Sequence, residues 1–514
     1  MTAAVKQTFL TIHNGRAVPR HNVPRLSQEQ FGHAILDALA DGCRVSALFA
    51  APDGPDQSFD PLMYAVLADD ETSVLRLATA RIEGKTFPSL AQSCPQIQLF
   101  EREIAEQYGC TPVGHPWLKP VRFAPPLAPQ SSAPWSQDGE IPQIGVTDFY
   151  RVGGDEVHEV AVGPVHAGVI EPGHFRFQCQ GEEILHLEIS LGYQHRGVER
   201  ALIGGPDKRS IHYAETLAGD TTIGHGTAFS LAVEALANCR KSARAQALRG
   251  IGLELERLAN HIGDLGALAG DVGFLPTASF CGRIRGDFLN MTAAICGNRF
   301  GRGFIRPGGV GFDITSELAL ELEQKLDKAR RDCQSAVELL WDSPSVMARL
   351  EQVGMVSSAT AQELGLVGPA ARASGLPRDV RQNHPWEFYQ FVQIPLSNCD
   401  SGDVFARAYV RWLEIQQSIK YLTERLRALP AGNLLSSVGP LATDQIVVSL
   451  VEGWRGEICH AVLTDQNGRF LRYKIVDPSF HNWPALACAM RGGQISDFPL
   501  CNKSFNLSYC GQDL

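Results

Sequence analysis

A proline-rich stretch between two segments of different texture most constrains how this chain can fold. Residues 124–150 carry five prolines among serines and glycines and show no helical periodicity, which is typical of a semi-extended linker. The whole chain has 514 residues, enough for two or three domains. We therefore expect a small domain over residues 1–123, a linker over 124–150 and a large domain over 151–514.

Hydrophobic patterning gives each domain a mixed character. In the small domain, apolar runs at 64–68 and 73–78 predict strands, and a helix with one apolar face then ends at Gly109. In the large domain, alternation within 160–190 and again within 445–476 predicts strands, with helices between them. The predicted fold class is α+β: a small α+β domain followed by a helix-rich domain with small sheets.

A long helix expected over about 244–268 carries a polar stripe beside its apolar one. The polar stripe consists of Glu254, Arg257, His261 and Asp264. Opposite charges at this spacing usually form a solvated, salt-bridged helix face. We interpret the stripe as structural pairing, with proton or conformational coupling as the alternative.

Charge and composition argue against several classes of protein. The chain has 56 acidic and 46 basic residues, a formal charge of −10, which is the wrong balance for a protein that binds nucleic acid through phosphates. No apolar run reaches the roughly 18 residues that span a bilayer, and the first residues have no signal-peptide core. No GxGxxG follows a predicted strand, so no NAD motif is recognisable. We expect a cytoplasmic chain.

The cysteines are numerous but never paired at short range. There are thirteen, and no two of them stand three positions apart, so the chain contains no CxxC. In a large chain without export signals, such cysteines are expected to be reduced thiols rather than disulfides.

The small domain resembles one component of a respiratory complex. Residues 100–109 (FEREIAEQYG) and 114–116 (GHP) resemble the ERExxDxFG…GHP signature of the C-type subunit of bacterial NADH–quinone oxidoreductase (complex I). Glu106 takes the place of the aspartate and Tyr108 that of the phenylalanine. This resemblance implies the fold of the C-type subunit for the small domain.

The large domain resembles the D-type subunit of complex I and the related large subunits of [NiFe]-hydrogenases. The segments that carry this resemblance are 163–166 (GPVH), 171–175 (EPGHF), 191–199 (LGYQHRGVE), 225–234 (HGTAFSLAVE), 302–309 (RGFIRPGG), 452–457 (EGWRGE) and 477–483 (DPSFHNW). The C-terminal segment 497–509 (DFPLCNKSFNLSY), and the fusion of a C-like to a D-like domain, indicate the formate hydrogenlyase and hydrogenase-4 branch.

The hydrogenase resemblance implies a nickel site at four positions. In that family two CxxC pairs supply four thiolates, because soft sulfur ligands hold nickel. The matching positions here are Ala218 and Thr221 for the first pair, and Ser479 and Asn482 for the second. None of these side chains replaces a thiolate, so we expect no bound metal and no hydrogenase activity.

The quinone site of complex I is also altered. The resemblance places its headgroup tyrosine at Gly219 and rewrites its HPxxHG segment as residues 166–174 (HAGVIEPGH). Neither of the two known site chemistries is therefore intact. Quinone binding in an altered form stays open.

What remains at these positions is a polar set that we take as the candidate proton or acceptor site. Its members are His166, His174, Asp220, Thr221, His225, Asp477, Ser479, His481 and Asn482. In a dry cleft such groups can relay protons, since burial and neighbours shift their pKa values. The alternative is that hydrogen-bonded polar residues fill a former metal site and only hold the fold.

The resemblance implies a component of a membrane-associated, hydrogenase-4-like or complex I-like redox complex. Without a [NiFe] centre, it would couple electron transfer near an iron–sulfur cluster of a partner to the membrane module, with quinone or another molecule as acceptor. The alternatives are a non-catalytic coupling scaffold and, third, a working formate hydrogenlyase-type hydrogenase. The implied partners are a small iron–sulfur subunit, a ferredoxin-like subunit and antiporter-like membrane subunits, which would hold the chain at the inner membrane while it binds no cofactor itself.

Overall fold

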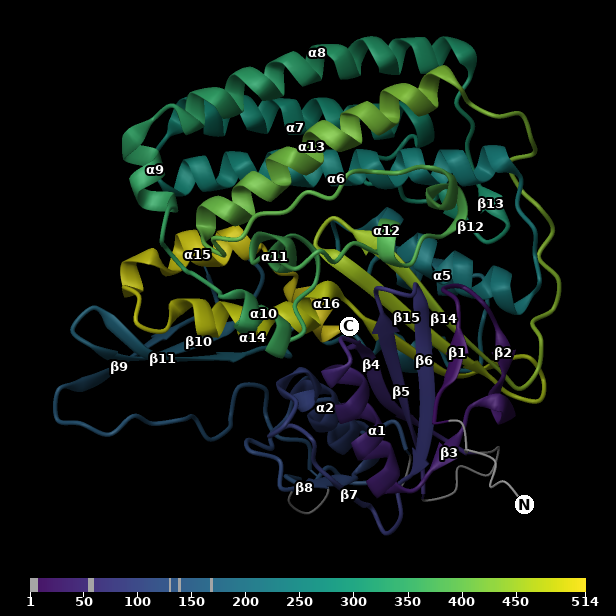
Figure 1. Ribbon diagram of the computed structural model, residues 1–514, viewed down its shortest axis with the longest axis vertical. Coiled ribbons are helices and arrows are strands. Elements are labelled where there is room, and N and C mark those ends of the chain that lie inside the picture. The colour runs from purple at the N-terminus through teal and green to yellow at the C-terminus, as the bar shows by residue number, and fades with distance from the viewer. Residues whose placement is uncertain (1–7, 54–59, 129–130, 137–139, 167–169) are drawn as a thin grey trace.

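The computed structural model describes residues 8–53, 60–128, 131–136, 140–166 and 170–514. Figure 1 shows a layer of long helices at the top, a sheet beneath it, a second sheet near the N-terminus at the bottom, and a smaller sheet extending to one side. The fold is α+β, as the sequence predicts.

The N-terminal sheet forms the small domain. Its strands are β1 (Leu10–Ile12), β3 (Arg25–Leu26), β4 (Arg44–Ala51), β5 (Leu62–Asp69) and β6 (Val74–Arg81). The order is β1-β6-β5-β4, with β3 parallel to β6. Strands β4 and β5 are buried along their whole length, because elements pack against both faces of the sheet. The two strands expected at 64–68 and 73–78 are confirmed as β5 and β6.

Two helices complete this domain. Helix α1 (Gln28–Ala40) begins with a capping box between Ser27 and Gln30. Helix α2 (Gln98–Tyr108) ends at Gly109, which has φ 65° and forms the predicted C-cap. A short parallel pair, β7 (Thr86–Pro88) and β8 (Thr111–Val113), flanks α2.

The central sheet combines the two ends of the chain. Its strands are β2 (Val18–Pro19), β14 (Gln445–Gly453), β15 (Gly456–Thr464) and β16 (Phe470–Val476), in the order β16-β15-β14-β2. Val18 pairs with Ile446, and the Asn14 amide exchanges two hydrogen bonds, of 2.9 and 2.8 Å, with the backbone of Leu450. The N-terminal segment therefore completes the sheet of the large domain.

Long helices cover the central sheet (Figure 1). They are α5 (Thr222–Leu236), α6 (Ala243–Asp271), α7 (Leu275–Cys296), α8 (Ser316–Trp341) and α13 (Val404–Arg427). Helix α5 packs on β14 and β15, and α6 packs between α5, α7 and α13. The long helix expected over about 244–268 is confirmed as α6.

The side sheet packs against the C-terminal helices. Its strands are β9 (Val157–Val162), β10 (His174–Gln180) and β11 (Glu183–Ser190), and they lie next to α14 (Pro478–Met490) and α15 (Phe498–Phe505). Phe175 and Phe177 of β10 both contact the ring of Phe498, at centroid distances of 4.8 and 4.9 Å. The strands expected within 160–190 are thus confirmed.

Short elements connect these layers. They are α3 (Val198–Leu202), α4 (Ser210–Glu215), β12 (Ile305–Arg306), β13 (Gly309–Val310), α9 (Pro344–Leu350), α10 (Ser358–Glu363), α11 (Gly368–Ala373), α12 (Val380–Asn383) and α16 (Tyr509–Asp513).

The polar stripe of α6 is not a solvated helix face. Glu254, Arg257, His261 and Asp264 are all buried, because α6 is enclosed by its neighbours on every side that the stripe faces. Glu254 pairs with Arg257 and Arg381, His261 lies 2.8 Å from Glu414, and Asp264 pairs with Arg411. The predicted pairing is therefore confirmed, and most partners come from elements distant in the sequence.

A buried charge cluster joins the small domain to the large one. Lys474 of β16 donates to both carboxylate oxygens of Glu103 on α2, at 2.7 and 2.6 Å. Arg122 pairs with the same carboxylate, while Arg472 donates to Glu199 at 2.8 Å. These buried ion pairs fix the position of α2 on the central sheet. If α2 or β16 shifted, a buried charge would lose its partner, which is costly away from solvent.

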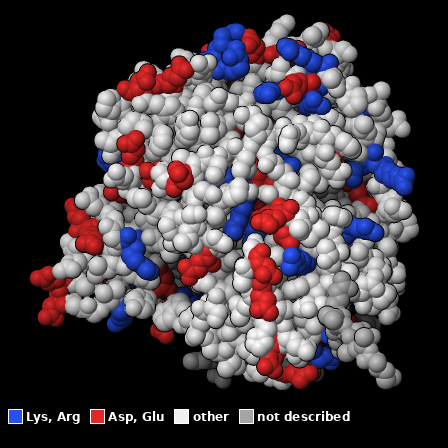
Figure 2. All heavy atoms as spheres, viewed as in Figure 1, with Lys and Arg blue, Asp and Glu red and all other residues white. Residues whose placement is uncertain are grey.

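The surface carries charges of both signs. On the face drawn in Figure 2, acidic and basic side chains are interspersed and separated by wide uncharged areas. Among the described residues, no helix combines the length and the apolar character that a bilayer-spanning helix requires.

Candidate functional site

The centre of the candidate site is a buried pair between the first turns of two helices. Asp477 is the N-cap of α14, and its Oδ1 accepts a hydrogen bond of 2.8 Å from the backbone N–H of Ser479. Its Oδ2 accepts a hydrogen bond of 3.0 Å from Nε2 of His225 on α5. The two residues are 1% and 0% exposed, so solvent does not reach the pair.

The pair extends into a row of four side chains. Nδ1 of His225 lies 3.1 Å from Nε2 of His460 on β15, and Nδ1 of His460 lies 2.9 Å from the hydroxyl of Tyr473 on β16. One assignment satisfies every atom: Tyr473 donates to His460, His460 to His225 and His225 to Asp477. In this assignment the row leads from the phenol of Tyr473 through two neutral imidazoles to the carboxylate of Asp477.

Burial sets the ordinary protonation states in this row. Burial, together with the neighbouring His225, lowers the pKa of His460 well below its usual value, and burial raises the pKa of Tyr473 well above its own. Burial opposes ionisation of Asp477, but the hydrogen bond from His225 and the charge of Arg455 outweigh it and lower the pKa of that carboxyl. The row thus ends in one carboxylate, with neutral groups at the other end.

Asp220 and Arg455 form the more exposed end of the site. Both oxygens of Asp220 accept hydrogen bonds from the Arg455 guanidinium, at 2.6 and 2.8 Å, and this guanidinium stacks 3.9 Å over the ring of Trp454. Thr221 donates to Asp220 at 3.1 Å. Burial opposes the charge of Asp220, but Arg455 lowers the pKa of its carboxyl. The Asp220 side chain is 32% exposed, so a ligand approaching here would meet it before His225.

Glu256 of α6 is a further titratable group at the start of α5. Its oxygens accept hydrogen bonds from the backbone N–H groups of Ile223 and Gly224, at 2.7 and 3.1 Å. Burial, with the nearby charge of Asp220, raises the pKa of Glu256 to about 8 despite these hydrogen bonds. Sequence reasoning missed Glu256, although it lies within the patterned helix beside the polar stripe.

At the four positions that the hydrogenase resemblance assigns to nickel ligands, the protein itself provides partners for every polar side chain. Ala218 is buried, Thr221 accepts a hydrogen bond of 3.2 Å from the indole of Trp454, and Ser479 accepts one of 2.8 Å from the backbone of Ser508. Asn482 bonds both the N–H and the C=O of residue 367 at 3.1 Å. This donor set contains no thiolate and does not fit a [NiFe] centre.

No cysteine occupies one of these four positions, although Cys510 lies beside Gly219 at the edge of the site. All thirteen are free thiols, as predicted, and Cys501 is buried beside Arg407. Cys510 contacts the hydroxyl of Ser508 at 3.4 Å. Within the described ranges, no three His, Cys, Asp or Glu side chains are grouped so that they could hold a metal ion.

Three of the predicted histidines do not join the His225–Asp477 pair. Nε2 of His166 lies 2.8 Å from the carbonyl of Gly173, and the ring of His174 lies tilted against that of Phe149, with ring centroids 5.4 Å apart. His481 packs against Phe100, and burial lowers its pKa to about 4. The expected single polar set is therefore divided, because His481 points from α14 toward α2 and the other two belong to the β9–β10 region. Residues 167–169 of that region lie outside the described residues.

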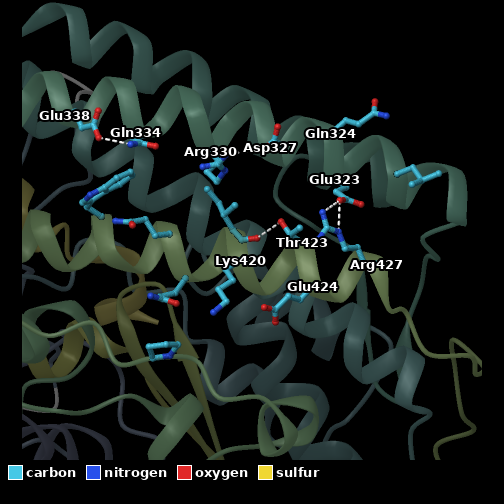
Figure 3. Close-up of a pocket in the computed structure, with 16 residues that line it drawn as sticks. Glu323, Gln324, Asp327, Arg330, Gln334, Glu338, Lys420, Thr423, Glu424 and Arg427 are labelled. Carbon is cyan, nitrogen blue, oxygen red and sulfur yellow. Dashed lines mark hydrogen bonds and ion pairs between the residues drawn. The ribbon is translucent and has the colours of Figure 1, made fainter.

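A groove of about 1180 Å³ lies between α8 and α13, away from these residues. Figure 3 shows its lining of mixed charge, in which Glu323 pairs with Arg427. Its wall contains none of the predicted site residues.

Comparisons with protein families match both halves of the chain. Residues 27–140 match the family described as "Respiratory-chain NADH dehydrogenase, 30 Kd subunit". Residues 271–445 and 436–513 match the family described as "Respiratory-chain NADH dehydrogenase, 49 Kd subunit".

Individual relatives cover most of the chain. The carbon monoxide-induced hydrogenase of Rhodospirillum rubrum is 30% identical over 350 residues, which cover 68% of this chain and 97% of that protein. Formate hydrogenlyase subunit 5 of Escherichia coli (strain K12) is 29% identical over 442 residues, covering 83% of this chain and 77% of that protein.

A solved structure shares the fold. A chain of the membrane-bound sulfane sulfur reductase, described as an archaeal respiratory membrane complex, superposes with a TM-score of 0.65 at 22% identity. The match covers 70% of this chain and 99% of that one.

Proposed function

Because this chain belongs to the family that includes the carbon monoxide-induced hydrogenase and the complex I 49 kDa subunit, joined to a 30 kDa-type domain, we propose that it is a nickel-free coupling component of a membrane-associated redox complex. Electrons would pass through an iron–sulfur cluster of a small partner subunit and a ferredoxin-like subunit. Antiporter-like membrane subunits would anchor the complex at the inner membrane. This chain would transmit the redox event to them.

One observation carries the proposal: the ligand positions are occupied by side chains that the protein itself satisfies. A thiolate site needs open sulfur donors, whereas Ser479 and Asn482 are committed to backbone groups of residues 508 and 367. The absence of any CxxC in the sequence supports the same conclusion.

The closed row of side chains supports coupling rather than acceptor chemistry at its centre. His225 and Asp477 are sealed from solvent, so a quinone or another acceptor would reach no deeper than Asp220. A row of hydrogen-bonded groups can instead shift a proton when a nearby cluster changes charge. In the alternative, a non-catalytic scaffold, the same contacts hold the fold together and no proton moves along them.

Nickel content tests the first part of the proposal. The complex is purified natively through a tag on this chain, and nickel and iron are measured per chain by mass spectrometry of metals. We expect iron from the partner clusters and nickel close to zero. One nickel per chain would contradict the proposal and would favour the alternative that the protein is a working hydrogenase.

Substitutions at the pair test the coupling role. In His225→Gln and Asp477→Asn complexes we expect electron transfer to stay within about twofold of wild type while the number of ions moved per electron falls. His158→Gln, an exposed histidine on β9, is the matched control and should change neither quantity. Complete loss of electron transfer in an intact complex would instead indicate an acceptor site, and unchanged ion movement would support the scaffold.

A further inference from the structure

A second pocket, open to solvent on one side, lies where the small domain meets the side sheet. This cavity of about 450 Å³ is lined by residues of α2, β11 and α14 and by the segments around Trp117 and Tyr150. Its volume falls in the range of small-molecule sites in proteins. It shares no lining residue with the His225–Asp477 pair.

Aromatic side chains form one wall of this cavity. Trp117 and Tyr150 meet edge to face at 6.3 Å, and Tyr150 lies 4.7 Å from the ring of His186. Glu188 holds two of them in place, because its oxygens accept hydrogen bonds from the Trp117 indole at 3.3 Å and from the Tyr150 backbone at 2.8 Å. A fixed aromatic wall of this kind suits a flat apolar group.

Two buried polar atoms at this cavity have no partner. The indole N–H of Trp483 and Oε1 of Gln512 make no hydrogen bond within the described part of the chain, and both side chains are only 3% exposed. A buried unsatisfied polar atom costs about 1–3 kcal/mol, so such atoms are rare without a ligand or water. Both residues line the cavity, so a shift of its wall would bring one further donor and one further acceptor to a bound molecule.

Arg102 supplies positive charge at the same cavity. Its Nε and Nη2 donate to the carbonyls of Lys119 and Pro120, at 2.8 and 2.6 Å, which leaves Nη1 without a protein partner among the described residues. Arg102 forms no ion pair with a described carboxylate, and burial lowers its pKa to about 10, against the weak opposing effect of Glu106. The ammonium of Lys119, which also lines the cavity, is already paired with Glu188. An incompletely paired arginine at a cavity wall favours an anion.

We propose that this cavity binds a small amphipathic organic anion, whose flat apolar body lies along Trp117 and Tyr150 and whose carboxylate meets Arg102. The proposal does not depend on the proposed function of the chain.

The position of the cavity connects it to the candidate site. Trp483 belongs to α14, the helix whose N-cap is Asp477, and Gln512 follows Gly511, which packs on the Asp477 carboxylate. A ligand here therefore touches the two elements that hold Asp477 in place.

Binding of 2-naphthoate to the full-length chain tests the proposal, with uncharged 2-naphthamide as the matched probe. Calorimetry should show that the naphthoate binds at least about tenfold more tightly. In an amide and indole NMR spectrum, the Trp483 indole signal, assigned with Trp483→Phe, should move on addition of naphthoate. Equal binding of both probes, or no binding of either, would overturn the proposal, as would an unmoved Trp483 signal.

Variants of the cavity test whether the anionic probe binds beside Arg102. Arg102→Gln should weaken naphthoate binding about tenfold and leave naphthamide unchanged, and Ala487→Trp, which fills the cavity, should abolish both. Arg427→Gln, on the distant α8–α13 groove, is the control and should bind as wild type does. Unaltered naphthoate binding in both Arg102→Gln and Ala487→Trp would show that the probe binds elsewhere and would refute the site. Should either variant unfold, the comparison of the two probes on the wild type still decides the outcome.

Discussion

Nε2 of His225 lies 3.0 Å from Oδ2 of Asp477, although the two residues are 252 positions apart in the chain. The contact joins the first turn of α5 to the N-cap of α14 in a place that solvent does not reach. The pair therefore links the two halves of the large domain through one hydrogen bond with charge on at least one side.

Replacing Asp477 by Asn should destabilise the chain by about 3 kcal/mol at neutral pH, because the carboxylate that accepts from both His225 and the backbone N–H of Ser479 becomes an uncharged amide with one acceptor oxygen. The pKa of Asp477 is lowered from its usual 3.8. The ionised Asp477 therefore adds to the free energy of unfolding above its usual pKa. This stabilisation disappears as the pH falls through the lower pKa of the folded state. Urea unfolding of wild type and Asp477→Asn, followed from about pH 6 down to about pH 3, should show the difference shrinking. A difference that stays constant over this range would show that charge plays no part in the contact.

Lys474→Met should destabilise the contact between the two domains by about 3–5 kcal/mol, because Glu103 keeps its buried charge and loses one of its two cations. Lys325→Met is the matched control: its ion pair with Glu321 is exposed and should contribute no more than about 0.5 kcal/mol. Denaturant unfolding of both variants measures the two values. Similar losses of unfolding free energy in the two variants would mean that the buried Lys474–Glu103 pair stabilises the protein no more than an exposed ion pair does.

Glu256 should make stability fall with rising pH. Its folded-state pKa, about 8, lies above its usual 4.5. The contribution of the protonated Glu256 to the free energy of unfolding is therefore fully present below the usual pKa, and it is lost as the pH rises through the folded-state pKa. The variant Glu256→Gln cannot ionise, so its free energy of unfolding should depend less on pH between about 5 and about 9 than that of wild type. Exposed Glu351, changed to Gln, serves as control and should keep the wild-type slope.

Gly511→Ala should disturb Asp477 directly. A Cβ at this position would lie 2.6 Å from the Asp477 carboxyl carbon, and such overpacking costs about 1–3 kcal/mol. Gly282 of α7 has nothing within 4 Å of its would-be Cβ, so Gly282→Ala should be neutral or stabilising by up to about 1 kcal/mol. Thermal unfolding separates the two, and equal effects would refute the close packing of α16 on the site.

Local patterns predicted the elements well because those elements are decided by nearby residues. The apolar face of α2, its end at Gly109 and the long stripe of α6 all follow from spacing and capping. The burial of Glu254 and Arg257 could not be predicted in this way. Charges at i and i+3 look the same on a surface helix as on an enclosed one, and the residues that enclose them, such as Arg381, come from elsewhere in the chain.

The candidate site was predicted only where a motif marked it. His225 and Asp477 stand in segments that resemble a known family, and the structure brings these two together. His460 and Tyr473 stand in alternating strands, where the period shows which residues share a face but not which face meets α5. His166 and His174 stand in marked segments as well, yet their contacts are with the backbone of Gly173 and the ring of Phe149.

The pairing of β2 with β14 also affects how the chain is synthesised. A ribosome completes the edge strand first and its sheet last, so the N-terminal segment must wait, unpaired, until nearly the whole protein has emerged. During that interval the growing polypeptide exposes a strand edge that chaperones or partner proteins would have to shield. A fragment started after the linker would carry the same open edge permanently, which makes aggregation, rather than loss of activity, the first defect to expect from separating the halves.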